Sequence, residues 1–191
     1  VGGLPKNPSP PYNYKAPFSP IDVIEEYTRP ARMRINSQVV TKPALSDLEF
    51  FNFSEVGKLE AFNTDGLRSL LQTMGHIPNM KEKTLRYPGH AKLIQSMIDD
   101  GLFNNKNFNK TINRLFKDWK LKEDEPEFTI LDINIYSDSK NIHYHLYDET
   151  DDILKSSSMA RTTGFTATAT INMLLNNCLL YTSDAADDHH R

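Results

Sequence analysis

Residues 59–90 constrain the fold most, because in this stretch short runs of apolar residues alternate with polar turns. It opens with Glu-Ala-Phe-Asn-Thr-Asp-Gly at 60–66 and closes with Lys-Thr-Leu-Arg-Tyr-Pro-Gly-His at 83–90. Four apolar residues between these ends have the spacing of one helix face: Leu67, Leu70, Leu71 and Met74. Residues 63–65 can cap the start of this helix and Gly75 its end. The pattern predicts strand, turn, helix, loop, strand, and another helix after residue 89.

Three side chains near the end of this stretch are candidates for ligand binding. Arg86, Tyr87 and His90 place a guanidinium, a phenol and an imidazole within five residues, at the ends of regular elements. Such a set suits an anionic small molecule that carries a carboxylate. Alternatively, Arg86 pairs with a nearby acid such as Glu82 or Asp65, and Tyr87 only packs. The residues alone leave both interpretations open.

Composition limits the class of protein. With 191 residues, of which 38% are hydrophobic, the chain can bury one sizeable core. A net charge of -3 and an isoelectric point of about 6.1 indicate no nucleic-acid partner. No apolar run approaches the roughly 20 residues that span a bilayer, so no membrane partner is expected. The single cysteine excludes an internal disulfide framework and favours a cytoplasmic location.

The remaining elements follow from hydrophobic period and turn residues. A proline-rich extended segment covers residues 1–20, and Ser19 begins a helix that ends before Pro30. Alternation over 128–136 and 142–147 predicts a long hairpin. Residues 43–55 are ambiguous, with Phe50, Phe51 and Phe53 expected in the core. The other predicted elements are a hairpin at 31–35 and 38–41, a strand at 56–62, and helices at 91–98, 111–119 and 159–175.

Nucleotide and metal motifs give little support to a complete enzyme within this chain. The sequence contains neither Gly-x-Gly-x-x-Gly nor a Gly-Lys-Ser/Thr loop. His143 and His145 lie two apart on a predicted strand, so both face the same side. Metal binding would need a third ligand that the sequence does not indicate, and a solvated sheet face is the favoured interpretation. We therefore predict no metal site.

The two ends of the sequence suggest a fragment. It starts at Val1 rather than at methionine, with Gly-Gly-Leu-Pro following directly. Residues 178–191 break the character of the chain and resemble the translation of sequencing-adapter read-through. We set this segment aside as a predicted artefact and treat residues 1–177 as one domain.

Five segments carry a resemblance to a known family. They cover 2–5, 14–32, 59–70, 81–90 and 158–167, and include Tyr-Lys-Ala-Pro-Phe-Ser-Pro-Ile-Asp-Val-Ile-Glu-Glu-Tyr from residue 14. Together they resemble the saccharopine dehydrogenase family, in particular its lysine 6-dehydrogenase-like branch. The resemblance implies an α+β fold, with a mixed, largely antiparallel sheet backed by helices, like the C-terminal domain of glyceraldehyde-3-phosphate dehydrogenase. It also implies a homodimer and an N-terminal Rossmann domain for NAD or NADP, which is absent from this chain.

The same resemblance assigns roles to individual residues. Arg86 is expected to bind a substrate carboxylate through a bidentate pair. A base must accept the amine proton, and it is either His90 or Lys15. The further candidates for the substrate pocket are Tyr87, Ser19 and Asn63. The residues expected near the cofactor are Gly2, Gly3, Thr162 and Thr163, and the two threonines are equally interpretable as helix caps.

The chemistry implied by the resemblance is hydride transfer between NAD or NADP and a carbon–nitrogen bond. In one version L-lysine is oxidised to allysine, and in the other the substrate is saccharopine, the lysine–glutamate adduct. An alternative of another class is a cofactor-free domain that binds amino acids or serves dimerisation. The sequence does not indicate whether the cofactor is NAD or NADP, because the residues that distinguish them belong to the Rossmann domain, which is absent from this chain.

Overall fold

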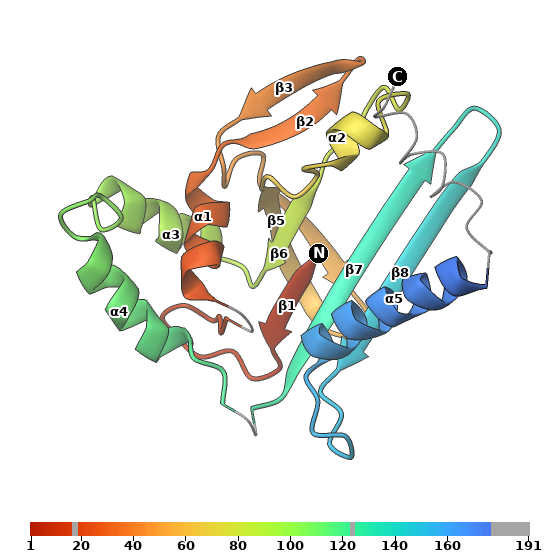
Figure 1. The fold of residues 1–191 in the computed structure, drawn as a ribbon. Helices are drawn as coiled ribbons and strands as arrows, with labels where there is room; N and C mark the ends of the chain where they lie inside the picture. Colours follow the sequence, from red (N-terminus) through yellow and green to blue (C-terminus); the bar gives the residue numbers. More distant parts are fainter. Residues whose placement is uncertain (17–18, 123–124, 177–191) are drawn as a thin grey trace.

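A computed structural model describes residues 1–16, 19–122 and 125–176. Within these ranges thirteen elements follow one another (Figure 1). They are β1 (Gly2–Pro5), α1 (Pro20–Thr28), β2 (Ala31–Ile35), β3 (Gln38–Lys42), β4 (Glu49–Phe53), β5 (Gly57–Asn63), α2 (Leu70–Thr73), β6 (Lys83–Arg86), α3 (His90–Asp99), α4 (Phe108–Trp119), β7 (Glu127–Tyr136), β8 (Asn141–Glu149) and α5 (Ser158–Leu175).

The strands form two three-stranded antiparallel sheets and a separate hairpin. The sheet orders are β1-β7-β8 and β4-β5-β6, and β2 pairs with β3. Strands β1 and β6 lie side by side at a seam between the two sheets. There the amide of Leu85 donates to the Val1 carbonyl at 2.8 Å, and the Val1 amino group donates to the Lys83 carbonyl at 2.9 Å. These two bonds have the pattern of a parallel ladder. The predicted mixed, largely antiparallel sheet is therefore confirmed.

The core lies between the strands and helices α1, α3 and α4, which pack together at one side of the molecule (Figure 1). Val23, Ile24 and Tyr27 repeat at helical spacing, so α1 presents one apolar face to this core. Trp119 at the end of α4 is fully buried and contacts the rings of Tyr12 and Tyr14. Full burial of such a side chain is worth about 1.5–3 kcal/mol. This packing fixes α1 and the start of α3 over the end of β6.

The hairpins and the long helices match their predictions. Asn36 and Ser37 both have positive φ, 49° and 67°, as a two-residue primed turn requires. Strands β7 and β8 form the predicted hairpin and pair from Phe128 and Glu149 to Tyr136 and Asn141. Helix α5 begins at Ser158, and its cap Ser157 accepts a hydrogen bond from the Ala160 amide. Among the described residues, no helix is long and apolar enough to cross a membrane.

Two expectations for the middle of the chain were wrong. The helix predicted over 67–74 shrinks to the single turn of α2, and Leu70 is 46% exposed. Asp65, one of the residues expected to cap this helix, instead accepts hydrogen bonds from Arg32. Phe50 and Phe51 are 51% and 44% exposed rather than in the core. Among the described residues, strand β4 pairs only with β5 and lies at the edge of its sheet.

Candidate substrate-binding site

Arg86 ends β6 and is held beneath α1. Its side chain is buried, with Nε donating to the hydroxyl of Tyr27 at 2.8 Å and Nη1 donating to the Leu85 carbonyl at 2.8 Å. The guanidinium carbon lies 4.5 Å from the ring centroid of Tyr14, a cation–π distance. These contacts fix the orientation of the guanidinium plane. The acids that the sequence suggested as partners, Glu82 and Asp65, bond to other residues.

His90 begins α3 and completes a chain of hydrogen bonds from Arg86. Its Nε2 lies 2.9 Å from the Tyr27 hydroxyl and its Nδ1 lies 2.9 Å from the carbonyl of Tyr12. A carbonyl can only accept, so Nδ1 carries the hydrogen and Nε2 accepts from Tyr27. The donors therefore run in one direction, from Arg86 through Tyr27 and His90 to Tyr12. His90 is neutral and has both ring nitrogens engaged.

Burial sets the charges of this cluster. Desolvation, together with the nearby charge of Arg86, lowers the pKa of His90 to about 3, so the imidazole is a very weak base. Desolvation raises the pKa of Tyr14 to about 12, although the charge of Arg86 acts in the opposite direction. Both groups are therefore uncharged at neutral pH. Arg86 supplies the one positive charge of this buried cluster.

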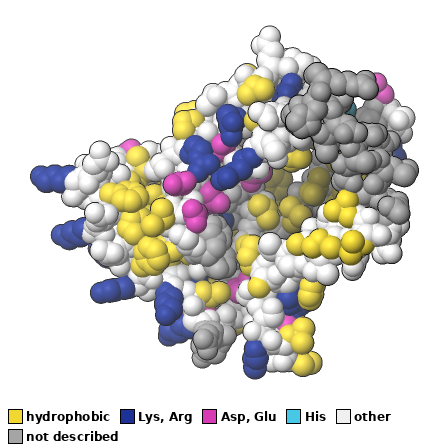
Figure 2. All heavy atoms as spheres, viewed as in Figure 1, with side chains coloured by type: hydrophobic (Ala, Val, Ile, Leu, Met, Phe, Trp, Pro, Cys, Tyr) yellow, Lys and Arg dark blue, Asp and Glu magenta, His cyan; other side chains and the backbone are white. Residues whose placement is uncertain are grey.

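Glu26 marks the side on which the cluster opens to solvent. Its Oε2 lies 3.6 Å from Arg86 Nη2, an ion pair too long for a hydrogen bond. The Glu26 side chain is 33% exposed while that of Arg86 is 4% exposed. Burial raises the pKa of Glu26 although Arg86 opposes this shift. Figure 2 shows acidic and basic side chains gathered beside a hollow of the molecular surface. A guanidinium beside a carboxylate matches the opposite charges of a free amino acid's carboxylate and ammonium groups.

The side chains of the other predicted pocket residues form hydrogen bonds with partners other than Arg86 and His90. Lys15 donates from Nζ to the carbonyl of Asp118 at 3.0 Å, at the end of α4. Asn63 is buried and donates to Ser46 and to Asp47, both at 3.0 Å. Tyr87 donates its hydroxyl hydrogen to the Pro5 carbonyl at 2.9 Å. The structure thus brings together Arg86 and His90, and it ties the other side chains to the backbone or to neighbouring loops.

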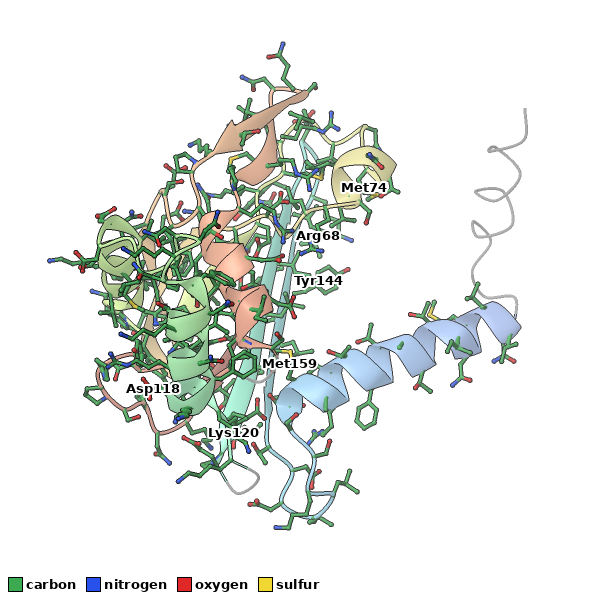
Figure 3. All side chains as sticks on the ribbon, turned by 60° about the vertical axis from the view of Figure 1, so that its left-hand side comes forward. Arg68, Met74, Asp118, Lys120, Tyr144 and Met159 are labelled. Atoms are coloured by element: carbon green, nitrogen blue, oxygen red, sulfur yellow. The ribbon has the colours of Figure 1, made fainter. Side chains whose placement is uncertain are left out.

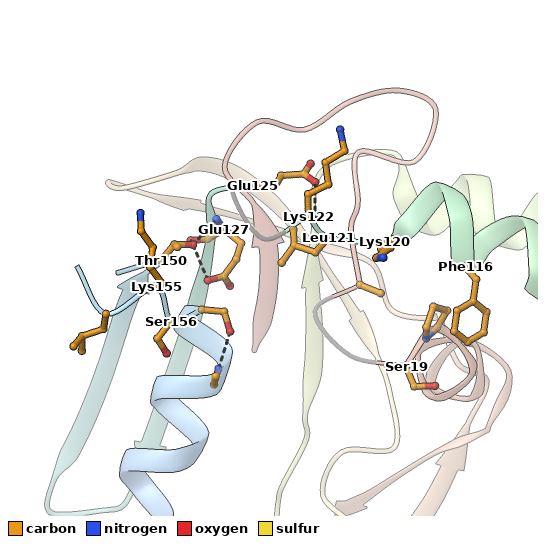
Figure 4. Close-up of a pocket in the computed structure, with 15 residues that line it drawn as sticks. Ser19, Phe116, Lys120, Leu121, Lys122, Glu125, Glu127, Thr150, Lys155 and Ser156 are labelled. Atoms are coloured by element: carbon orange, nitrogen blue, oxygen red, sulfur yellow. Dashed lines mark hydrogen bonds between the residues drawn. The ribbon is translucent and has the colours of Figure 1, made fainter. Parts of the chain in front are cut away.

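Ser19 lines a different space. A cavity of about 1240 Å³ opens between the end of α4, residues 120–122, the loop over 150–157 and the first turn of α5 (Figure 4). At its wall, the carboxylate of Glu127 accepts hydrogen bonds from the Ser158 amide at 2.5 Å, the Ser158 hydroxyl at 2.6 Å and Thr150 at 3.1 Å. Glu127 is therefore fully engaged in holding the start of α5.

The residues expected near a dinucleotide, Gly2, Gly3, Thr162 and Thr163, lie on two elements, β1 and the first turns of α5. A Cβ on Gly2 would lie 2.9 Å from the Leu85 carbonyl oxygen, so the small size of Gly2 is already required by the seam between β1 and β6. Gly3 is buried within β1. Thr162 donates to the Ser158 carbonyl within α5 and Thr163 is exposed. Neither threonine caps the helix, because Ser157 does, so the capping interpretation was wrong.

Sequence reasoning missed three members of the cluster: Tyr14, Tyr27 and Glu26. The helical spacing of Tyr27 with Val23 and Ile24 placed it on a buried face, but that spacing does not say which polar group its hydroxyl meets. Tyr14 lies in a proline-rich segment without periodicity. The chemistry of arginine could have indicated such neighbours, because a buried guanidinium needs several acceptors or aromatic faces around it.

The fold is that of an α+β domain: a mixed sheet backed by helices, with no Rossmann unit among the described residues. The sequence matches the model of the saccharopine dehydrogenase C-terminal domain over residues 1–184. The chain belongs to this family. The match reaches into residues 178–191, and the origin of that segment as a read-through artefact stays a prediction.

A solved structure shows the same fold. It is apo histidine-tagged saccharopine dehydrogenase (L-Glu forming) from Saccharomyces cerevisiae, with a TM-score of 0.69 and 14% sequence identity. The match covers 92% of this chain and 57% of that chain. The chain therefore spans little more than half the length of that protein, and at this identity the likeness concerns the fold.

Proposed function

We propose that this chain is the substrate-binding part of an NAD(P)-dependent oxidoreductase that acts on a C–N bond of lysine or of a lysine-derived amino acid. Family membership supports the general class. The observation that carries the substrate class is the pair of Arg86 and Glu26, 3.6 Å apart at the edge of the buried cluster. Oxidation of L-lysine to allysine is the first candidate reaction, and the saccharopine reaction is the second.

In this proposal the substrate α-carboxylate binds the Nη groups of Arg86 and the α-ammonium binds Glu26. Nε of Arg86 already donates to Tyr27, so the guanidinium does not have to reorient when the substrate arrives. Pre-orientation reduces the entropy lost on binding. Because His90 is buried and weakly basic, we assign it to holding Tyr27 and Arg86 in place. Lys15 stays a candidate for the base.

The nicotinamide cofactor is assigned to another part of the full-length protein. This sequence has no glycine-rich phosphate loop, and the close approach of β1 to Leu85 requires the small size of Gly2. The share of this chain in catalysis is then to bind and orient the amino acid. Such a domain leaves the choice between NAD and NADP to the Rossmann half.

A titration of this chain with lysine and two of its analogues tests the proposed head-group site. Cadaverine lacks the α-carboxylate and 6-aminohexanoate lacks the α-ammonium. We expect L-lysine to bind at least about tenfold more tightly than either, because a charge-assisted hydrogen bond contributes about 1.5–3 kcal/mol. Glu26→Gln should abolish the preference for lysine over 6-aminohexanoate. Glu25→Gln, one residue away on the exposed face of α1, should not.

The affinities also separate the enzyme from the alternative class. A domain that shares its substrate with a Rossmann half should bind lysine only weakly alone, with Kd of about 1 mM. Tight binding without any cofactor would favour a cofactor-free amino-acid-binding domain. Equal affinities for all three ligands, or an equal effect of Glu25→Gln, would contradict the site at Arg86 and Glu26.

A specific observation supports the dimerisation role. Four large apolar side chains lie on one face of the β7–β8 hairpin and are 38–56% exposed: Ile133, Ile135, Tyr144 and Leu146. We name these four the hairpin patch. Tyr144 projects from the hairpin away from α1 and α4 (Figure 3). Clustered exposed apolar residues are typical of protein interfaces. We infer a homodimer that buries the hairpin patch.

A further inference from the structure

The opposite face of the same hairpin carries a polar cluster. Asp132 on β7 lies directly across from His145 on β8, and Asn134 lies across from His143. Side chains two apart on a strand, and those of directly paired residues, point to the same face. The pairing of the two strands therefore brings one carboxylate and two imidazoles together. This supplies the third ligand that the sequence alone did not indicate.

The distances within the cluster fit a metal ion. Asp132 Oδ2 lies 2.8 Å from His143 Nε2 and 3.2 Å from His145 Nδ1. One ligand atom from each of the three residues lies within 4.8 Å of the others. Bonds of about 2.0–2.1 Å in a tetrahedral zinc site separate the ligand atoms by about 3.3 Å. Small side-chain rotations therefore suffice to place all three around one ion.

Neighbouring groups orient the ligands as they do around bound metals. The second ring nitrogen of His145, Nε2, lies 3.2 Å from Glu55 Oε1, and the Phe53 ring stacks on the imidazole with centroids 6.1 Å apart. Asn134 donates to the second oxygen of Asp132 at 2.8 Å. A metal-bound histidine usually donates its other N–H to a carboxylate. Glu55 is placed to accept that bond while Nδ1 faces the ion.

We propose that Asp132 Oδ2, His143 Nε2 and His145 Nδ1 bind a divalent transition-metal ion, with zinc as the best match. Two imidazole ligands favour zinc and its neighbours over magnesium and calcium, which prefer oxygen ligands. The three side chains are 23–56% exposed, so an ion can reach them. Three protein ligands leave one coordination position for water or a further group.

The site joins two parts of the fold. His143 and His145 belong to β8, whereas Glu55 belongs to the turn between β4 and β5. A metal ion at this point fixes the β7–β8 hairpin against the β4-β5-β6 sheet. Because it binds only the folded arrangement, it raises the stability of the domain by mass action.

Isothermal titration of this chain with ZnCl₂ tests the site. His189 and His190 near the C-terminus, and Cys178, could also bind zinc. All variants therefore carry His189→Ala, His190→Ala and Cys178→Ser, and no histidine tag is used. We expect one zinc ion per chain and a rise in Tm on adding zinc. His143→Ala and His145→Ala should each abolish both effects. Glu55→Gln should weaken binding about 10- to 100-fold, as expected of an orienting group.

His76→Ala is the matched control, because His76 is exposed and lies in the loop between α2 and β6. It should bind zinc as the parent does. Cobalt gives an independent readout, since Co²⁺ in a low-coordinate protein site absorbs visible light far more strongly than hexaaqua Co²⁺. Absence of zinc binding by the parent, or equal binding by the parent, His143→Ala and His145→Ala, overturns the site.

Discussion

His90 shows how burial couples one residue to the stability of the domain. Its pKa falls from 6.5 to about 3 on folding, because desolvation and the charge of Arg86 both disfavour the imidazolium. Between these two values the unfolded chain binds a proton that the folded chain does not. Stability therefore rises with pH across this window and is lost as pH falls. We expect His90 alone to change the unfolding free energy by about 1.4 kcal/mol per pH unit between about pH 6 and pH 4.

Urea unfolding at several pH values checks this dependence against His90→Asn. The asparagine amide can still donate toward the Tyr12 carbonyl but does not titrate. The variant is expected to be less stable than the parent at pH 7, and the difference should shrink as the pH falls. Contributions of carboxyl groups cancel in the comparison. Parallel curves for the parent and the variant would mean that His90 titrates alike in the folded and unfolded states.

At the scale of elements, local patterns predicted the hairpins and helices but not their surroundings. The β7–β8 hairpin and the turn at Asn36 and Ser37 were predicted correctly, because both depend on residues that are neighbours in sequence. The exposure of Phe50 depends on which elements pack against β4 in the folded chain, and a local pattern does not specify these. In the same way, sequence identified Arg86 and His90 but not Tyr27, which joins them from another element.

The start of α5 is held by hydrogen bonds to a residue of strand β7. Glu127 on β7 accepts three hydrogen bonds there, two of them from Ser158. Its carboxylate also faces the positive end of the helix dipole. Glu127→Gln replaces one acceptor oxygen by a donor, so we expect a loss of about 1–3 kcal/mol in stability and faster amide hydrogen exchange in α5. Glu125→Gln is the control. An unchanged exchange rate in α5 would show that Glu127 does not hold the helix.

At the scale of the whole molecule, helices α1, α3 and α4 pack together at one side, and one face of the outer part of the β7–β8 hairpin stays exposed. α5 extends away from the helical body, as Figure 3 shows, and packs on β7 and β8 near its start. The two faces of the hairpin differ in chemistry, with the proposed metal ligands on one and the hairpin patch on the other. A dimer formed through the hairpin patch therefore leaves the metal ligands facing away from the contact.

Sedimentation equilibrium of the parent and Ile135→Lys tests this arrangement. Ile135 is 46% exposed in the single chain, and a lysine at this place would bring a charge into a buried interface. We expect the parent to be a dimer, and Ile135→Lys to raise the dimer Kd at least about tenfold, which is about 1.4 kcal/mol. Val39→Lys is the control, because Val39 is 53% exposed on the separate β2–β3 hairpin. A monomeric parent, or equal weakening by Val39→Lys, would assign the hairpin patch another role. The dimer should persist in His143→Ala, since the metal ligands lie on the other face.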